Sequence, residues 1–507
     1  MPSTIRSSFR VKNVENFIHA LHENENMLYI GIGRPQFWDV AASSDGVIPT
    51  PYNNLLSENA DWSDLMSLKR INNTSMAHCV VRRKWQANEK YDAYRHDWSG
   101  TRESVVAGIY PTDITESKFY CITDNGTAFI CIKQGVATDG SVVPSTQSPQ
   151  DGSSTIITGI TLAASSGLVQ CSDGYIWKKI ATLTTSYATA FLTAEYYPVT
   201  TIKINPGASD AAAADQWLNQ TNSQSHGGGI YNINIISTTT NWTVAGNYHI
   251  TDAKNGSTTG APSTKILSVI GDGTGLKFLA VIGDNKLKNI IVTDPGQGYT
   301  YAKFVMGTAG YSAGGNGTVL EAIFTPTRGL GVDPIRDLVA HNLVINSTFD
   351  SDENDKAVDL NHREFTVTNE YRKVVLLANP KLLNGTLATA SKLDMTHYMT
   401  YTGTTPNPDD IITQNTPEVK GRVLDAGATT MRVLRIYAPE SSNEEAGSPE
   451  SDFAVGSYST AGGSQTVDTI IEPEVEYGSG DIIYVDYRRP ILRDINQLED
   501  IKIVVEY

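Results

Sequence analysis

The sequence predicts a mainly β protein in which a small α+β domain accompanies nested β-sandwich or barrel-like modules. Through the middle of the chain, short β-rich runs alternate with turns of Gly, Asn and Asp. A helical stripe and a strand open the chain, and two apolar runs close it. Because 507 residues exceed what one hydrophobic core can organise, we expect about two to four domains.

The N-terminal segment predicts a helix followed by a strand. Four apolar residues recur at the spacing of one helix face: Val14, Phe17, Ile18 and Leu21. Residues 27–33 (MLYIGIG) then form an apolar run that is typical of a strand. Apolar side chains in residues 62–68 indicate a second helical stripe, and residues 80–85 (VVRRKW) end the segment.

Two apolar runs, at residues 482–485 and 501–505, predict strands near the C-terminus. Pro490 lies between them, and proline has no backbone donor, so it belongs at a strand edge or a bend. Two arrangements fit this pattern. Either the strands form an ordinary closing hairpin, or they complete a sheet that begins near the N-terminus, since chain ends fray unless they are tied down.

The middle of the chain begins with a predicted β-hairpin at residues 118–132, where an Asp-Asn-Gly turn separates two β-rich runs. Residues 211–218 indicate a short helix at best. Residues 230–237 alternate apolar and polar side chains, as a half-buried strand does.

A short internal repeat follows. The sequence Val-Ile-Gly-Asp occurs at residues 269–272 and again at residues 281–284, each time between β-rich runs. This spacing of strand, turn and strand predicts a small antiparallel β module. Residues 440–465 are rich in Ser, Gly and Glu and indicate an exposed loop, while the flanking Thr and Val favour a second β module.

Composition narrows the classes of function. The net charge of −16 argues against a broad nucleic-acid surface, because binding phosphates requires a basic face. Twenty-four tyrosines stand against twelve phenylalanines. Tyrosine combines an apolar ring with a polar tip, so this excess suits wet interfaces and also half-exposed strands.

The N-terminal residues lack the apolar core of a signal peptide, and no run approaches the length of a membrane span. We therefore expect a product that is made and kept in the cytoplasm, without membrane contact. Four cysteines occur without a C-x-x-C pair: Cys79, Cys121, Cys131 and Cys171. They predict buried free thiols and no zinc or redox site.

Four constellations suggest catalysis or ligand binding, but each lacks a required part. Residues 226–229 (HGGG) resemble an oxyanion-hole loop, but no G-x-S-x-G elbow accompanies them. Residues 271–275 lack the Lys-Ser/Thr of a phosphate loop. Residues 350–355 lack the glycine of a calcium loop, and His19 and His22 lack a distant third metal ligand. We expect no catalytic, cofactor-binding or metal-binding residues.

Several short motifs occur along the chain in an order that resembles a known family. YIGIGRPQFW, PTPYNN, a W-x-x-L-M element and VVRRKW lie near the N-terminus, DGYIW lies at residues 173–177, and FTVTNEYRKVVLLANP and DIIYVDYRRPI lie towards the C-terminus. This order resembles the family of gene product eight, a baseplate wedge protein of T-even-type myoviruses. Residues 488–490 (Arg-Arg-Pro) depart from the Arg-Pro-Pro to which that family tends, and residues around 225–345 and 385–475 are additional to its compact members.

The resemblance implies a nested architecture. Residues 1–110 with 476–507 would form the terminal α+β domain, and residues 111–224 with 346–384 a β-rich middle domain. Residues 225–345 and 385–475 would be two inserted β modules. The implied site residues are structural motif positions: Gly33, Arg34, Trp38, Arg82, Arg83, Trp85, Asp173, Gly174, Tyr175, Trp177, Arg488 and Pro490.

The resemblance also implies a function. It indicates a structural subunit of a contractile-tail bacteriophage baseplate wedge, located in the virion and assembled in the host cytoplasm. Its partners would be a second copy, as a homodimer, and other wedge proteins, without nucleic acid, membrane, cofactor or small-molecule substrate. The alternative is a tail protein that binds or depolymerises host glycans, for which acidic charge, exposed tyrosines and β modules are equally suitable.

Overall fold

The computed structural model is mostly β, with 46% strand and 15% helix, which confirms the predicted fold class. The structure describes these residues: 5–22, 26–34, 48–98, 104, 111, 113–137, 140–155, 161–240, 242–243, 245–251, 257–259, 267–306, 317–350, 371–436, 452–489 and 498–507. The chain forms two compact units: unit 1 holds residues 1–14, 77–344 and 504–507, and unit 2 holds residues 15–76 and 345–503. The four-part division expected from the sequence stays a prediction.

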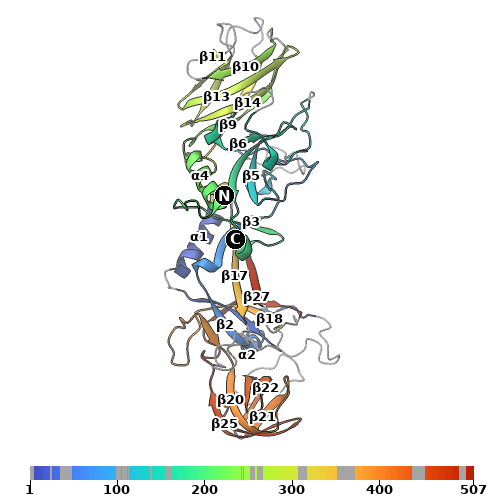
Figure 1. Cartoon of the computed structure of the whole chain (residues 1–507), viewed down its shortest axis with the longest axis vertical. Helices are drawn as coiled ribbons and strands as arrows, with labels where there is room; N and C mark the ends of the chain where they lie inside the picture. Colours follow the sequence, from blue (N-terminus) through green and yellow to red (C-terminus); the bar gives the residue numbers. More distant parts are fainter. Residues whose placement is uncertain are drawn as a thin grey trace, which may run out of the picture. The chain divides into compact units, whose positions relative to one another are not determined.

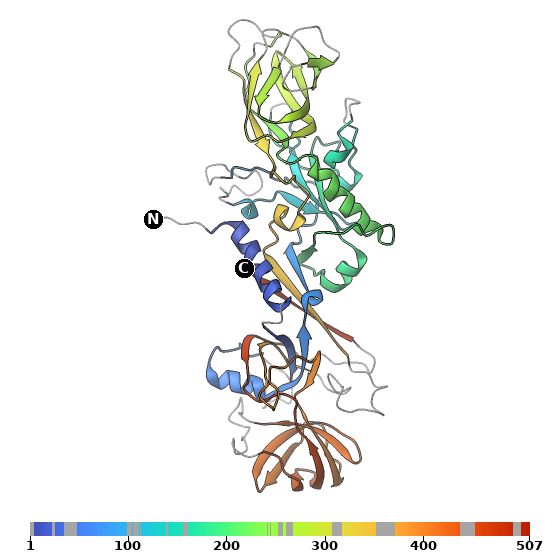
Figure 2. The same cartoon turned by 90° about the vertical axis from the view of Figure 1, so that its left-hand side faces the viewer.

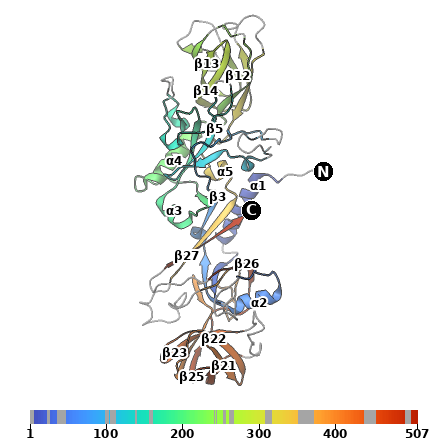
Figure 3. The same cartoon turned by 90° about the vertical axis from the view of Figure 1, so that its right-hand side faces the viewer.

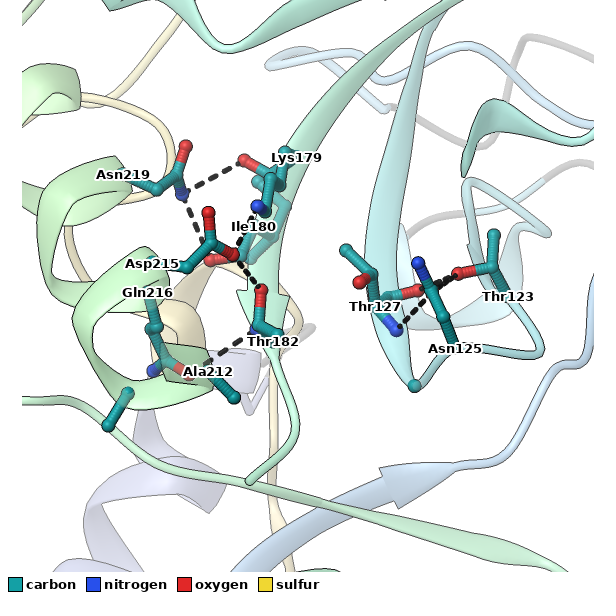
Figure 4. A network of polar contacts seen from close by, with 12 residues as sticks. Thr123, Asn125, Thr127, Lys179, Ile180, Thr182, Ala212, Asp215, Gln216 and Asn219 are labelled. Atoms are coloured by element: carbon teal, nitrogen blue, oxygen red, sulfur yellow. Dashed lines mark hydrogen bonds and ion pairs between the residues drawn. The ribbon is translucent and has the colours of Figure 1, made fainter. Parts of the chain in front are cut away.

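Unit 1 contains a four-stranded sheet that confirms the predicted hairpin. In sheet order its strands are β4 (Tyr120–Ile122), β5 (Thr127–Lys133), β7 (Ile176–Thr182) and β6 (Leu168–Gln170). β4 and β5 pair in antiparallel fashion around the Asp-Asn-Gly turn, where Gly126 has a φ of +76°. Asn125 holds this turn, because its Oδ1 accepts from the hydroxyl of Thr123 at 2.6 Å and from the backbone N of Thr127 at 3.2 Å (Figure 4).

Helix α4 (Ala211–Gln224) packs against strand β7 of this sheet (Figures 3 and 4). Its N-cap is Asp210, whose carboxylate accepts from two backbone N–H groups of the first turn. Asn219 Nδ2 donates to the backbone oxygens of Lys179 and Ile180, at 3.2 and 3.3 Å. The helix is therefore longer than the short segment predicted at residues 211–218, because polar side chains bind its C-terminal half to the strand.

The remainder of unit 1 is also built from antiparallel strands. One sheet has the order β11 (Ser257–Thr259), β10 (Gly246–Thr251), β13 (Thr274–Gly283) and β14 (Lys286–Gln297) (Figure 1). Two strand pairs accompany it: β12 (Leu267–Gly271) with β15 (Ala302–Met306), and β16 (Val319–Phe324) with β9 (Ile230–Ser237). The strand predicted at residues 230–237 is confirmed, and so is the repeated pattern of strand and turn after residue 269.

A further sheet has the order β27 (Leu498–Glu506), β17 (Asn342–Asp350), β3 (Met76–Val81) and β8 (Tyr196–Val199). Strands β17 and β27 each begin in one unit and end in the other, as does helix α1 (Ser7–His22). The short helices α3 (Thr185–Phe191) and α5 (Pro334–Asp337) complete the helices of unit 1 that the structure describes.

Unit 2 contains a five-stranded sheet with β1 at its centre. In sheet order its strands are β19 (Lys392–Asp394), β2 (Leu65–Ile71), β1 (Leu28–Gly33), β18 (Lys373–Ala378) and β26 (Asp481–Tyr487). All six residues of β1 are buried, which confirms the predicted strand. The helical stripe predicted at residues 62–68 is wrong from residue 65 onwards, because helix α2 (Leu55–Ser63) ends within it and residues 65–71 pair with β1 as a strand.

The C-terminal runs are both strands, but they do not form the closing hairpin. β26 joins the sheet of β1 through β18, whereas β27 lies in the sheet of β17 and β3. The sheet that begins with β1 is therefore completed by a strand from near the C-terminus, which is the second arrangement expected from the sequence.

The rest of unit 2 is a closed barrel (Figure 2). Its strands, in order around the barrel, are β20 (His397–Gly403), β23 (Thr430–Arg435), β22 (Glu418–Ala426), β21 (Ile411–Asn415), β24 (Gly456–Thr460) and β25 (Gly463–Ile471). Of the loop predicted at residues 440–465, residues 440–451 lie outside the described residues. The prediction is wrong for residues 456–460 and 463–465, which belong to β24 and β25 and pair in antiparallel fashion, with Tyr458 and Gln465 buried.

Candidate functional site

The motif residues of unit 1 meet in one aromatic cluster. The rings of Tyr175 and Trp177 are stacked, with centroids 5.8 Å apart, and Tyr91 meets Trp177 edge-on at 5.1 Å. Both motif aromatics are fully buried among the side chains of the β5–β7 sheet. Trp85 packs against the same cluster from the segment after β3. Such aromatic pairs stabilise a core beyond their buried area, so the cluster is a structural element.

Asp173 organises the turn that precedes the motif aromatics. Its Oδ2 accepts from the backbone N of Thr146 at 2.7 Å and of Gln147 at 3.1 Å, and its Oδ1 accepts from the backbone N of Tyr175 at 3.0 Å. Gly174 lies at φ +88°, a backbone region that glycine enters without steric cost. The turn therefore requires both residues, Asp173 as the hydrogen-bond acceptor and Gly174 for its positive φ.

Arg82 and Arg83 bind backbone carbonyls of neighbouring loops. Arg82 Nη1 donates to the oxygen of Thr193 at 3.1 Å, and its backbone N donates to Glu195. Arg83 donates to the oxygens of Thr115 and Ser117. The guanidinium of Arg83 also lies over the ring of Tyr120, 5.0 Å from its centroid, which fixes the loop to the sheet.

In unit 2, Gly33 and Arg34 lie at the end of β1. The backbone of Gly33 passes so close to Asp64 that a Cβ would lie 2.9 Å from the Asp64 oxygen. Arg34 is 4% exposed, and its Nη2 binds Asp409 Oδ2 at 2.7 Å. Asp409 belongs to the chain segment of the barrel, so Arg34 joins the five-stranded sheet to the barrel within unit 2.

A buried lysine, which no sequence pattern had indicated, lies beside these residues. Lys373 Nζ contacts Asp61 Oδ1 at 2.9 Å and Asp64 Oδ2 at 2.8 Å, and the lysine side chain is fully buried. Its ammonium lies 4.8 Å from the centroid of the Tyr487 ring. Burial raises the pKa of Asp61, an effect that the Lys373 charge opposes. This cluster ties α2 to strands β18 and β26.

Arg488 binds Asp486 of its own segment, with Nη2 to Oδ2 at 2.6 Å, and lies 6.0 Å from the Tyr371 ring. Arg34, Arg82 and Arg488 thus each bind a carboxylate or a backbone carbonyl. Trp38 and Pro490 lie outside the described residues, as does most of the acidic segment at residues 350–355.

Ser165 and His226 form a pair that superficially resembles a catalytic dyad. Ser165 Oγ lies 2.9 Å from His226 Nε2, while His226 Nδ1 lies 3.3 Å from the oxygen of Gly296 and 3.8 Å from Asp294 Oδ1. Burial lowers the pKa of His226. The pair does not line any of the cavities described for this structure. The HGGG segment is thus a tight connection between α4 and β9.

The cysteine thiols are placed where they are unreactive. All four are free and buried. Burial raises the pKa of the Cys79 and Cys171 thiols to about 12, and raises those of Cys121 and Cys131 well above their usual range. Thiols are nucleophiles as thiolates, so these groups are packing residues.

Among the described residues, no three His, Cys, Asp or Glu side chains are placed to hold a metal ion. No described helix is long and apolar enough to cross a membrane.

One exposed apolar surface in unit 2 was not predicted from the sequence. It is formed by the start of α2 and the outer strand β26, and we call it the β26 patch: Tyr52, Leu55, Leu56, Ile483 and Tyr484. Leu55 is 72% exposed and Ile483 is 52% exposed. A shallow cavity of about 320 Å³ lies between these two segments. Large apolar side chains that are exposed on neighbouring segments are typical of surfaces at which proteins bind one another.

The motif residues thus fix loops and pack aromatic rings in the core, which is the class of role that a structural protein requires. The family model described as "Bacteriophage T4, Gp8" matches residues 3–259, about half of the chain, and the chain belongs to this family. It is accordingly a structural protein of a bacteriophage baseplate wedge, located in the virion tail. The match contains the motif residues from Gly33 to Trp177 but not Arg488 or Pro490. No curated protein sequence matches the chain.

Proposed function

We propose that the chain is a non-enzymatic scaffold that binds other wedge proteins and forms a homodimer in a contractile tail. Membership of the baseplate family supports the scaffold role. The networks around Asp173 and Lys373 support it too, because they fix loops and strand ends in the way a rigid body requires. We further propose that the protein assembles in the host cytoplasm before it enters the virion.

The single observation that carries the homodimer is the β26 patch. Among the strands that the structure describes, β26 is the outermost of its sheet, so its second edge offers backbone donors and acceptors to another strand. A chain with a net charge of −16 repels its own copies at long range. A stable contact between copies therefore needs apolar surface and hydrogen bonds, and the patch combines both. Antiparallel pairing of two β26 strands about a twofold axis would bury Ile483 and Tyr484 of each copy.

Analytical ultracentrifugation of the wild type and of Ile483→Asp tests this proposal. The wild type should sediment as a dimer at micromolar concentration, and high salt should not weaken the dimer, because screening relieves repulsion between like charges. Ile483→Asp should sediment as a monomer. The matched control is Ile204→Asp, since Ile204 is 82% exposed and belongs to unit 1, whereas the patch belongs to unit 2. A wild-type monomer at both salt concentrations would contradict the homodimer, and a dimer that dissociates in salt would show that ion pairs hold it together.

A further inference from the structure

Two strands of unit 1 end their sheets side by side. Among the strands that the structure describes, β9 pairs with β16 alone and β14 pairs with β13 alone. The residue that precedes β9 lies against the end of β14, because a Cβ on Gly229 would lie 3.0 Å from the backbone oxygen of Gly296. The two strands thus approach each other at one end while their outer edges remain without a described partner strand.

Towards their other ends, β9 and β14 border a groove of about 990 Å³, which we call the β9–β14 groove. Its lining comes mainly from three segments. These are Asn232 with residues 234–238 at the end of β9, Asp284 with residues 286–289 at the start of β14, and the end of β5 with the segment that follows it. Ile236 of β9 is 54% exposed. The amides of Asn232, Asn234 and Asn289 add donors and acceptors to the lining. The groove therefore combines strand edges, apolar surface and amides.

The charge of the groove is opposite to that of the chain. Three lysines line it, at positions 133, 286 and 288, with Asp284 as the one lining carboxylate, and Lys288 pairs with Asp284. Lys133 Nζ donates to the oxygen of Ile290 at 2.7 Å, a carbonyl of β14. Burial lowers the pKa of Lys133 to about 8. A chain with a net charge of −16 thus presents a locally basic groove.

We propose that the β9–β14 groove binds an extended acidic segment of another protein, which adds as a strand along the edge of β9. Free strand edges give affinity through backbone hydrogen bonds, and pockets for alternate side chains give selectivity. The lysines favour carboxylates at these alternate positions. Sugar sites commonly stack rings on aromatic side chains, and the groove lining contains none, so the lining favours a peptide. This inference rests on the proposed scaffold role, because that role makes the partner a protein. It does not depend on the β26 patch.

Binding of a synthetic peptide tests the proposal. The probe is a fluorescent peptide of about ten residues that alternates valine with glutamate, titrated into the full chain to about 1 mM while anisotropy is measured. We expect saturable binding that salt weakens, and slower amide hydrogen exchange in residues 230–237 and 286–297. Lys286→Glu and Ile236→Asp change exposed side chains of the groove and should each weaken binding roughly tenfold. Lys303→Glu changes an exposed lysine outside the groove and should leave binding unchanged.

Several results would overturn the proposal. A valine–lysine peptide that binds equally well would remove the role of the lysines, and an N-methylated valine–glutamate peptide that binds equally well would remove strand addition. Protection of the same amides by an acidic oligosaccharide, but not by the peptide, would make the groove a glycan site. Absence of peptide binding up to about 1 mM would also refute it. None of these results affects the ultracentrifugation of Ile483→Asp. The experiments therefore distinguish a failure of the peptide-binding proposal from a failure of the proposed scaffold dimer.

Discussion

Trp85 and Asp173 are joined through a single hydroxyl. Trp85 Nε1 donates to Ser145 Oγ at 3.2 Å, and Ser145 Oγ lies 3.1 Å from Asp173 Oδ2, to which it donates. The two motif residues come from different segments of the chain, after β3 and before β7. Ser145 is fully buried between them, so this hydroxyl fixes the register of the loop against the aromatic cluster.

Asp173→Ala should destabilise unit 1 by about 1–3 kcal/mol, because it removes the acceptor shared by several donors of the turn. Asp173→Asn should cost less, since its amide oxygen can still accept some of these bonds. Urea denaturation measures both effects. Asp124→Ala, an exposed aspartate in the β4–β5 turn, is the control and should change stability little. Equal stability of Asp173→Ala and the wild type would show that the turn does not depend on this carboxylate.

Asp409→Ala should destabilise unit 2 by about 1–3 kcal/mol, because it deprives a nearly buried guanidinium of its carboxylate. Arg34→Lys should also be destabilising, since an ammonium cannot reproduce the geometry of the guanidinium. Thermal unfolding measures both changes. If the double variant Arg34→Met with Asp409→Ala is as unstable as the sum of its single changes, the two residues do not interact.

Stability of unit 1 should rise with pH above neutrality because of Lys178. Its fully buried Nζ donates to Asn219 Oδ1 at 3.2 Å and to Ser223 Oγ at 2.8 Å, and burial lowers its pKa to about 7. An unfolded lysine keeps its proton to about pH 10.4. The unfolded state therefore binds more protons between these values, and the cost of burying the ammonium, complete below pH 7, is relieved as pH rises.

The test compares the wild type with Lys178→Met between pH 7.5 and 9.5, where the wild type should gain about 2 kcal/mol relative to the variant. The comparison cancels other titrating groups, including Asp337, whose pKa burial raises to about 6 and which is ionised throughout this range. Lys303→Met should show no such difference. A difference between wild type and Lys178→Met that stays constant with pH would mean that Lys178 remains charged in the folded protein.

Removing residues 501–507 should lower the stability of the folded chain by about 3 kcal/mol or more, because it exposes the surfaces covered by buried Ile501 and Ile503. Ile501→Ala should reproduce part of the loss. Leu498→Ala, in the same strand but 59% exposed, should have little effect. An unchanged midpoint of thermal unfolding after the truncation would show that β27 adds nothing to its sheet.

Local pattern was sufficient for several elements. Residues 27–33 form a strand because their uninterrupted apolar run suits a position buried on both faces, as in the centre of a sheet. The hairpin at residues 118–132 follows from a turn whose glycine needs a positive φ. The pairing of Arg34, Arg82 and Arg488 was predictable because guanidinium groups in apolar segments need acceptors, although their partners were not.

Other features depended on neighbours that are distant in sequence. Residues 65–68 are apolar at spacings compatible with either a helix or a strand, and pairing with β1 and β19 made them a strand. Residues 456–465 resembled a loop because Ser and Gly are common there, but most of them pair through backbone hydrogen bonds with other strands of the barrel. Lys178 and Lys373 gave no sign of burial, since their partners come from other segments.

The sequence by itself determined that this protein is mainly β, that it belongs with the baseplate wedge proteins, and where many of its strands and turns lie. These properties depend on the periodicity of apolar residues, on the residue types in turns and on the order of motifs, all of which are local features of the sequence. Only the tertiary structure decided that Trp85 meets Asp173 at one hydroxyl, that β26 and β27 enter different sheets, and that β9 and β14 border a basic groove. Such contacts join residues far apart in sequence, and their energy depends on burial and geometry that exist only after the chain has folded.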